Sequence, residues 1–179
     1  GCFHISHNSV KNIIYFTGGA NMVLNFDIKK LLKNVAIPVL VGALAGFLTK
    51  NDVNEFMETV NKPFFMPPGW LFPVVWTILY VLMGVAAYFI DISKAIDKDK
   101  ALLVYYAQLF FNFVWSFIFF TAGKYLFAFV WIIVLWLLIL LTIIKFKKID
   151  TRTVLLLAPY LVWVTFAAIL NLSIYILNR

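Results

Sequence analysis

The sequence predicts an all-α membrane protein, a five-transmembrane-helix bundle. Hydrophobic residues make up 64% of the 179 residues, a share well above that of soluble domains. Charged residues make up only 13% and lie mostly between long apolar runs. This pattern is expected when each membrane-buried backbone forms its hydrogen bonds within its own helix. Five of these runs are long enough, with their flanks, to cross about 30 Å of hydrocarbon.

The charge and cysteine content exclude several classes of function. The net charge of +7 does not indicate a nucleic-acid surface, because Lys and Arg bracket apolar runs instead of lining one soluble face. Cys2, His4 and His7 all lie in the N-terminal tail, so no metal site and no cofactor are expected. The tail, residues 1–21, lacks the pattern that follows, and Met22 resembles a natural start. We expect this tail to be foreign to the natural protein rather than a signal peptide.

The first predicted span covers about residues 28–49. Its uncharged part has only 16 residues, so we expect the flanking lysines to extend their ammonium groups to the interfaces. Pro38 is expected to kink the helix. Gly42 and Gly46 form a small-xxx-small pair that allows close approach of another helix. Packing within the bundle is favoured for this pair over contact with a second copy in a homodimer.

The segment 51–69 is predicted to be a lid. Phe56 and Met57, between acidic residues, indicate a short amphipathic helix at the membrane interface. The second half is restricted to extended or turn geometry by three prolines: Pro63, Pro67 and Pro68. A plain connector is the alternative, but a long loop with structure of its own is more often functional.

The second and third predicted spans, about residues 70–90 and 101–122, each carry an inward stripe at helical spacing. The second span has 21 uncharged residues from Trp70 to Ile90. Its stripe comprises Trp76, Leu79, Tyr80, Met83, Gly84 and Ala87. An amide in hydrocarbon is costly without a partner, so the polar stripe of the third span should face inward. This stripe comprises Tyr105, Gln108, Asn112, Trp115, Ser116 and Phe119.

The fourth and fifth predicted spans differ in character. The fourth, about residues 125–144, is apolar all round and is expected to form a lipid-facing wall that includes Trp131 and Trp136. The fifth, about residues 153–177, contains Pro159, which should kink it. Its inward stripe comprises Tyr160, Trp163, Ala167, Leu170 and Asn171.

The distribution of basic residues predicts the orientation in the membrane. Counted from Met22, ten basic residues lie near the N-terminal end of the first span and in the second and fourth loops, and four lie on the opposite side. Cytoplasmic loops carry the excess of Lys and Arg. We therefore expect a multi-pass protein with its N-terminus in the cytoplasm and its C-terminus outside.

Five spaced motifs occur in a fixed order: Lys62-Pro-x-x-x-Pro-Pro-Gly-Trp, Val75-Trp-Thr-x-Leu-Tyr-x-x-Met-Gly84, Gln108-x-x-x-Asn-x-x-Trp-Ser-x-x-Phe-Phe120, Pro159-Tyr-x-x-Trp163 and Thr165-Phe-Ala-x-x-Leu-Asn171. Together they resemble the TspO/translocator protein family, also called tryptophan-rich sensory proteins or peripheral-type benzodiazepine receptors. The resemblance covers about residues 31–178.

This resemblance implies a five-helix bundle whose pocket opens toward the long first loop. The implied ligands are porphyrins, including haem-related tetrapyrroles, and benzodiazepine-type or sterol-like molecules, so porphyrin or haem is expected as a ligand rather than a cofactor. The expected partners are this hydrophobic small molecule and membrane lipid. The family's pocket positions fall on Pro67, Trp76, Asn112, Trp115, Ser116, Trp163 and Ala167. Tyr80 and Gln108 join them from the inward stripes.

The chain departs from the family pattern at two positions. The family often has tryptophan where this chain has Phe56 and Phe65, and the change removes two indole N–H groups from the lid. The C-terminal run Leu172-x-x-Tyr175-x-x-x-Arg179 fits a loose sterol-binding pattern, but that pattern matches many membrane helix ends by chance.

A receptor or sensor for tetrapyrroles is the leading hypothesis, since a few polar groups converge in an apolar interior. The structural alternative is that these groups only join helices together. A light- and oxygen-dependent porphyrin-degrading enzyme, with Trp76 and Trp163 as oxidisable partners, is a second class and is not favoured. A tetrapyrrole transporter is a third, but no internal repeat or mid-span ionisable residue provides a coupling site.

Overall fold

The computed structural model describes residues 12–14 and 24–179. Within them the chain forms helices α1 (Ile28–Leu48), α2 (Lys50–Thr59), α3 (Leu71–Asp91), α4 (Lys98–Ser116), α5 (Tyr125–Lys147) and α6 (Arg152–Leu177). A π-helical turn, η1 (Phe117–Thr121), extends α4, and the strands β1 (Asn12–Ile14) and β2 (Leu24–Phe26) form an antiparallel pair. The expected foreign tail, with Cys2, His4 and His7, lies mostly outside the described residues.

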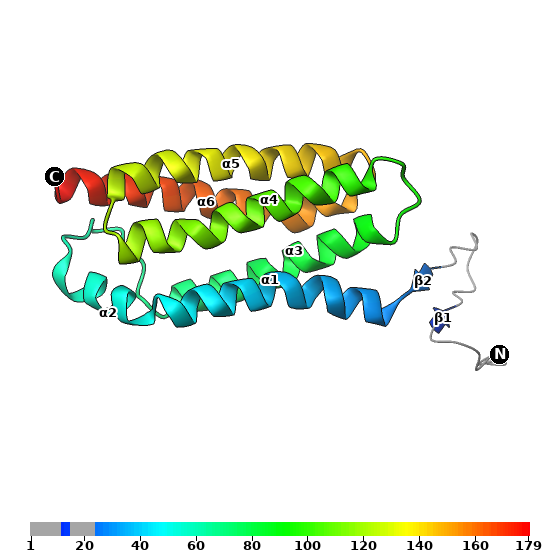
Figure 1. The fold of residues 1–179 in the computed structure, drawn as a ribbon, viewed down its shortest axis with the longest axis horizontal. Coiled ribbons are helices and arrows are strands. Elements are labelled where there is room, and N and C mark those ends of the chain that lie inside the picture. The colour runs from blue at the N-terminus through cyan, green and yellow to red at the C-terminus, as the bar shows by residue number, and fades with distance from the viewer. Residues whose placement is uncertain (1–11, 15–23) are drawn as a thin grey trace.

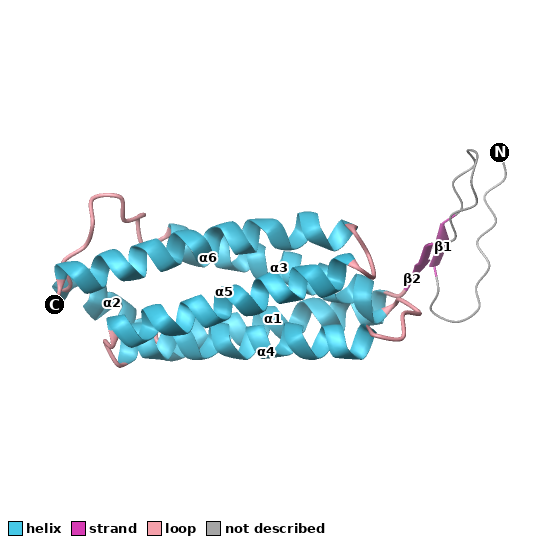
Figure 2. Cartoon of the chain, turned by 90° about the horizontal axis from the view of Figure 1, so that it is seen from above, coloured by secondary structure: helices cyan, strands magenta, loops and turns pink. Residues whose placement is uncertain are grey.

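The five long helices run side by side along the long axis of the molecule (Figures 1 and 2). Each is long and apolar enough to cross a membrane, so the predicted multi-pass helical bundle is confirmed. α1 packs mainly against α3, and α5 packs against both α4 and α6. α2 and the C-terminus lie at one end of the bundle, and the two strands lie beyond the other end.

The predicted spans agree with the helices to within a few residues. The largest differences are that α4 begins at Lys98 and α5 continues to Lys147. In both places lysines extend the helix beyond the apolar run. Lysine is a good helix former and its ammonium group can reach the interface from inside the last turn.

Two glycines allow α1 and α3 to approach closely. A Cβ on Gly84 of α3 would lie 2.5 Å from Cα of Val35, and a Cβ on Gly42 of α1 would overlap the ring of Tyr80. Gly42 therefore packs inside the bundle. Gly46 is exposed and a Cβ there would meet nothing within 4 Å, so the two members of the predicted small-residue pair face different surroundings.

The expectation that α5 is only a lipid-facing wall is wrong. Trp131 donates a hydrogen bond to the carbonyl of Phe111 at 2.9 Å, and Trp136 donates one to Thr165 Oγ1 at 2.9 Å. Both indoles are partly buried and pack against the core. The face of α5 between α4 and α6 is buried, and only the opposite face, which includes Val130 and Leu137, is exposed.

The predicted amphipathic helix in the lid is α2, and it is docked on the bundle. Phe56 is only 3% exposed, and its ring lies 5.3 Å from the rings of both Phe119 and Phe120. These two phenylalanines belong to the π-turn η1, where the extra residue per turn changes the direction of the side chains that follow. Thr121 of the same turn also donates a hydrogen bond to Asp52 of α2.

Candidate functional site

A buried chain of hydrogen bonds joins α3, α4 and α6. Tyr80 donates to Asn112 Oδ1 at 3.1 Å, and Asn112 Nδ2 donates to the hydroxyl of Tyr160 at 2.8 Å. The Tyr160 hydroxyl in turn donates to Gln108 Oε1 at 2.8 Å. Among the residues that the structure describes, the amide nitrogen of Gln108 reaches only the sulfur of Met83, at 3.8 Å. The thioether is a weak acceptor, so Gln108 holds the least satisfied donor of this polar cluster.

Trp76 packs against the polar cluster. Its ring stacks on Tyr80 with centroids 5.5 Å apart and meets Tyr160 edge-on at 6.1 Å. Aromatic contacts at these separations are favourable beyond simple burial. The cluster therefore fixes the position of this indole.

Trp115 and Ser116 lie one to two turns beyond Gln108 and Asn112 on α4, nearer the lid. Trp115 Nε1 donates to Asn171 Oδ1 at 3.4 Å, and Asn171 Nδ2 donates to the carbonyl of Tyr125 at 2.8 Å. The Trp115 ring stacks on Phe119 at 5.1 Å. The indole is thus tied to the aromatic cluster that receives α2. Ser116 is partly buried and ends α4 just before the π-turn.

Trp163 of α6 is different, because its buried Nε1–H has no hydrogen-bond partner among the residues that the structure describes. Its ring lies 5.9 Å from Phe72 and 5.5 Å from Phe166. An unpaired buried N–H is unusual, since it loses its bond to water without a replacement. Such a group is a candidate donor to a ligand.

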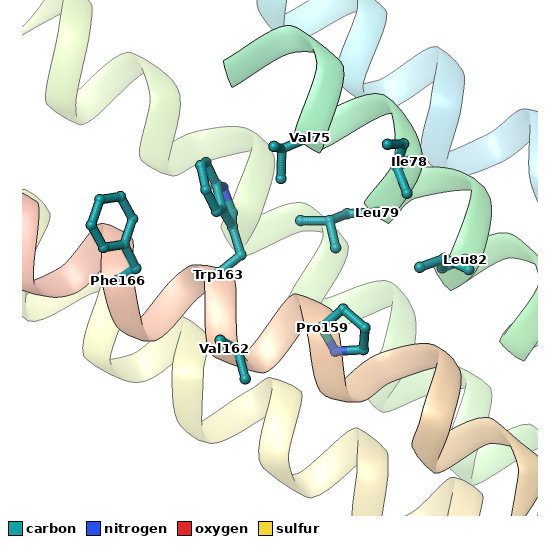
Figure 3. A pocket seen from close by; sticks show the side chains of 8 residues that line it. All are labelled: Val75, Ile78, Leu79, Leu82, Pro159, Val162, Trp163 and Phe166. Carbon is teal, nitrogen blue, oxygen red and sulfur yellow. The ribbon is translucent and has the colours of Figure 1, made fainter. Parts of the chain in front are cut away.

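Trp163 lines an apolar groove of about 510 Å³ between α3 and α6. Figure 3 shows this groove, formed by Val75, Ile78, Leu79 and Leu82 of α3 and Pro159, Val162, Trp163 and Phe166 of α6. Ile78 is 56% exposed and Val162 is 70% exposed, so the groove opens sideways onto the lipid-facing surface. Its volume lies within the range of small-molecule sites.

Pro67 and Ala167 are predicted site residues that are not among the residues lining the groove. Pro67 belongs to the lid loop, defined here as residues 60–69, and is partly buried. Ala167 is 8% exposed and lies one turn beyond Trp163 on α6. The lid loop reaches the groove through Phe65, whose ring lies 6.4 Å from that of Phe166.

The structure brings together some of the predicted ligand-binding residues. Tyr80, Gln108 and Asn112 meet in the polar cluster with Trp76 beside them, while Trp163 lines the groove and Trp115 lies near the lid. Asn112 and Trp76 are not among the groove-lining residues, so a single cavity shared by Asn112, Trp76 and Trp163 stays a prediction. The position of Tyr160 at the centre of the polar cluster was not predicted, although the sequence places this residue on the inward stripe of the fifth span. The aliphatic groove residues carry no signal that separates them from lipid-facing ones.

Comparisons with known proteins agree with this architecture. The sequence profile of the TspO/MBR family matches residues 34–177. The chain belongs to the TspO/MBR family. It is 36% identical to the tryptophan-rich protein TspO of Archaeoglobus fulgidus over 85% of this chain and 99% of that protein.

Further members of the family extend the comparison to other organisms. The tryptophan-rich sensory protein of Cereibacter sphaeroides is 38% identical over 76% of this chain and 84% of its own length. The translocator protein of Sus scrofa is 29% identical over 76% of this chain and 85% of its own length. Family membership and the five spanning helices support a role as a membrane receptor or sensor.

Proposed function

We propose that this protein is a membrane receptor that binds a flat hydrophobic ligand of the porphyrin class at the groove between α3 and α6. One observation carries the proposal: the buried Nε1–H of Trp163 is unpaired beside a groove of about 510 Å³ with apolar walls. An apolar ring bound in the groove covers its walls and shields them from lipid or water. An acceptor atom on the ring can then accept a hydrogen bond from the Nε1–H of Trp163. Benzodiazepine-type and sterol-like molecules with one acceptor fit the same description.

The absence of charge from the groove-lining residues limits how such a ligand lies. A carboxylate buried there without a partner would be costly. The ring therefore enters the groove, and the carboxylates at its edge stay at the lid end, since the lid carries the basic residues Lys50, at the start of α2, and Lys62, in the lid loop. Pro67 belongs to the same lid loop.

In this proposal the polar cluster acts mainly by positioning aromatic side chains. Tyr80, Asn112, Tyr160 and Gln108 already bond to one another, and they hold Trp76 behind the groove. Trp115 and Ser116 support the lid side, and the small side chain of Ala167 leaves room beside Trp163.

Titration of the purified protein with protoporphyrin, followed by quenching of tryptophan fluorescence, tests the proposal. The expected result is saturable quenching in the dark with one site per chain. A benzodiazepine-type ligand should compete for that site. Quenching that never saturates, or that is unaffected by substitution of Trp163, would contradict the proposal.

Two further measurements with protoporphyrin distinguish the other functions. Oxygen-dependent loss of porphyrin absorbance under light would favour a porphyrin-degrading enzyme, with Trp76 and Trp163 as oxidisable partners. Accumulation of porphyrin inside sealed vesicles would favour a transporter. A receptor binds the porphyrin and leaves both its absorbance and its location unchanged.

A further inference from the structure

One side chain joins the lid loop to the end of α6. The backbone N–H of Asn61 donates to Asn178 Oδ1 at 3.0 Å, and Asn178 Nδ2 donates back to the carbonyl of Asn61 at 2.9 Å. A single amide thus satisfies both backbone groups of a residue 117 positions away. The bond from Asn178 Nδ2 to the carbonyl of Ile174, at 2.8 Å, also closes the last turn of α6. Capping of the helix explains this last bond but not the two bonds to Asn61.

The two halves of the lid are attached differently. α2 is fixed by Phe56, which is buried among aromatic rings, and by the bond between Asp52 and Thr121. The lid loop instead carries Phe64, which is fully exposed. Segments with few buried apolar contacts open at low free energy. Val60, Phe65 and Met66 of the lid loop pack against the core but are only partly buried. We therefore expect the lid loop to open more readily than α2, with the two bonds to Asn178 as part of what holds it.

The lid loop also bears on the groove. Phe65 of the loop contacts Phe166, and Phe166 contacts Trp163 at 5.5 Å. Phe166 and Trp163 both line the groove, so movement of the loop withdraws Phe65 from the lid-side end of the site. Because the lid loop contacts Phe166 and a ligand in the groove would contact Phe166 as well, ligand binding and the position of the loop affect each other.

We propose that Asn178 is a latch that holds the lid loop against α6 and thereby regulates the lid-side end of the groove, where Phe65 contacts Phe166. The regulatory part rests on the proposed ligand function, whereas the latch itself is a property of the fold. Coupling between two sites is reciprocal. Ligand binding and loop opening therefore change each other's equilibrium by the same factor.

Hydrogen exchange of the full-length protein, without ligand, tests the latch. Asn178→Ala removes both bonds to Asn61 and should speed exchange of amides in residues 60–66 by about 5- to 150-fold, the effect of two hydrogen bonds. Ser173→Ala is a matched control, since Ser173 bonds only to the carbonyl of Ile169 on the same helix. Asn61→Ala is a second control, because the latch uses only the backbone of Asn61.

Faster exchange in Asn178→Ala alone supports the latch. Unchanged exchange in Asn178→Ala, or equal acceleration in all three variants, overturns it, because the loop would then be held by other contacts or would respond to any local change. Exchange within α2 should stay slow in every variant, and acceleration there would contradict the division of the lid into a fixed and a moving half.

Stopped-flow quenching with protoporphyrin tests the regulation separately. Asn178→Ala should bind protoporphyrin several-fold faster than the wild type, and Ser173→Ala should not. Equal association rates would overturn the regulatory role. A wild type that binds no protoporphyrin would overturn the proposed function instead, and the exchange comparison would still decide whether Asn178 holds the loop.

Discussion

Asn112 and Tyr160 form the central pair of the buried polar cluster, with Asn112 Nδ2 donating to the tyrosine hydroxyl at 2.8 Å. Tyr160 is fully buried, and its hydroxyl donates a hydrogen bond to Gln108 Oε1. One hydroxyl therefore satisfies two amides that come from the same face of α4. This pair ties α4 to α6, and Trp76 of α3 packs edge-on against the Tyr160 ring.

Replacement of Tyr160 by phenylalanine should destabilise the bundle. The change keeps the ring but leaves one donor of Asn112 and one acceptor of Gln108 unpaired, at a cost of about 1–3 kcal/mol. Unfolding in detergent mixtures measures this loss of stability. Tyr106→Phe is the control, since Tyr106 is 38% exposed on α4, the helix that carries Asn112 and Gln108. Equal stability of the two variants, combined with weaker porphyrin binding by Tyr160→Phe alone, would assign these amides to the ligand instead of the fold.

The inward direction of this polar face could be predicted from sequence, but the partners could not. Gln108, Asn112 and Ser116 recur at helical spacing, and the cost of an unpaired amide in lipid decides which way they face. Which residue of α6 meets Asn112 depends on how each helix is rotated and shifted along its axis. Spacing within one helix contains no information on that rotation.

The same limit explains the errors and omissions elsewhere. Trp136 reads as lipid-facing because α5 is apolar all round, and its acceptor, Thr165, lies on α6. The π-turn at the end of α4 brings Phe119 and Phe120 against Phe56, which a helical pattern does not reveal. The span limits, by contrast, were predictable because charged residues bracket most of the apolar runs and a proline-rich segment precedes the second.

Gly84→Ala should destabilise the protein by about 1–3 kcal/mol, the usual cost of overpacking a rigid contact. The new Cβ would lie 2.5 Å from Cα of Val35 and 2.8 Å from the carbonyl oxygen of Asn34. Both are backbone atoms that cannot turn aside. Gly46→Ala is the control, because its Cβ points into open space and alanine favours the helix. Thermal unfolding in detergent should separate the two variants, and equal melting temperatures would mean that α1 and α3 can move apart freely.

The orientation of the bundle can be tested by cysteine labelling. The ten basic residues of the predicted cytoplasmic side and the four of the other side lie near opposite ends of the helices (Figure 1). In a variant without Cys2, a cysteine at Arg179 should react with an impermeant maleimide on intact cells, and one at Lys98 should react only after permeabilisation. Arg179 is chosen because Asn178 contacts the lid loop. Labelling of position 98 alone on intact cells would reverse the assignment.

Trp163 should be the tryptophan whose loss most weakens porphyrin binding. Trp163→Leu removes both the ring and the unpaired N–H and should weaken binding by about 1–3 kcal/mol, a factor of about 5–150. Trp163→Phe keeps a ring at the groove and should lose only the part due to the hydrogen bond. Fluorescence titration with protoporphyrin measures both variants.

Trp136 of α5 provides the control for Trp163. Trp136 was expected to face lipid, but its N–H already bonds to Thr165. Trp136→Phe therefore removes an indole N–H that a groove ligand does not need, and binding should stay within about twofold of wild type while stability falls by about 1 kcal/mol. If Trp136→Phe weakens binding as much as Trp163→Phe does, the ligand does not use the unpaired N–H. The groove between α3 and α6 would then be a lipid-filled packing surface, and the site would lie elsewhere in the bundle.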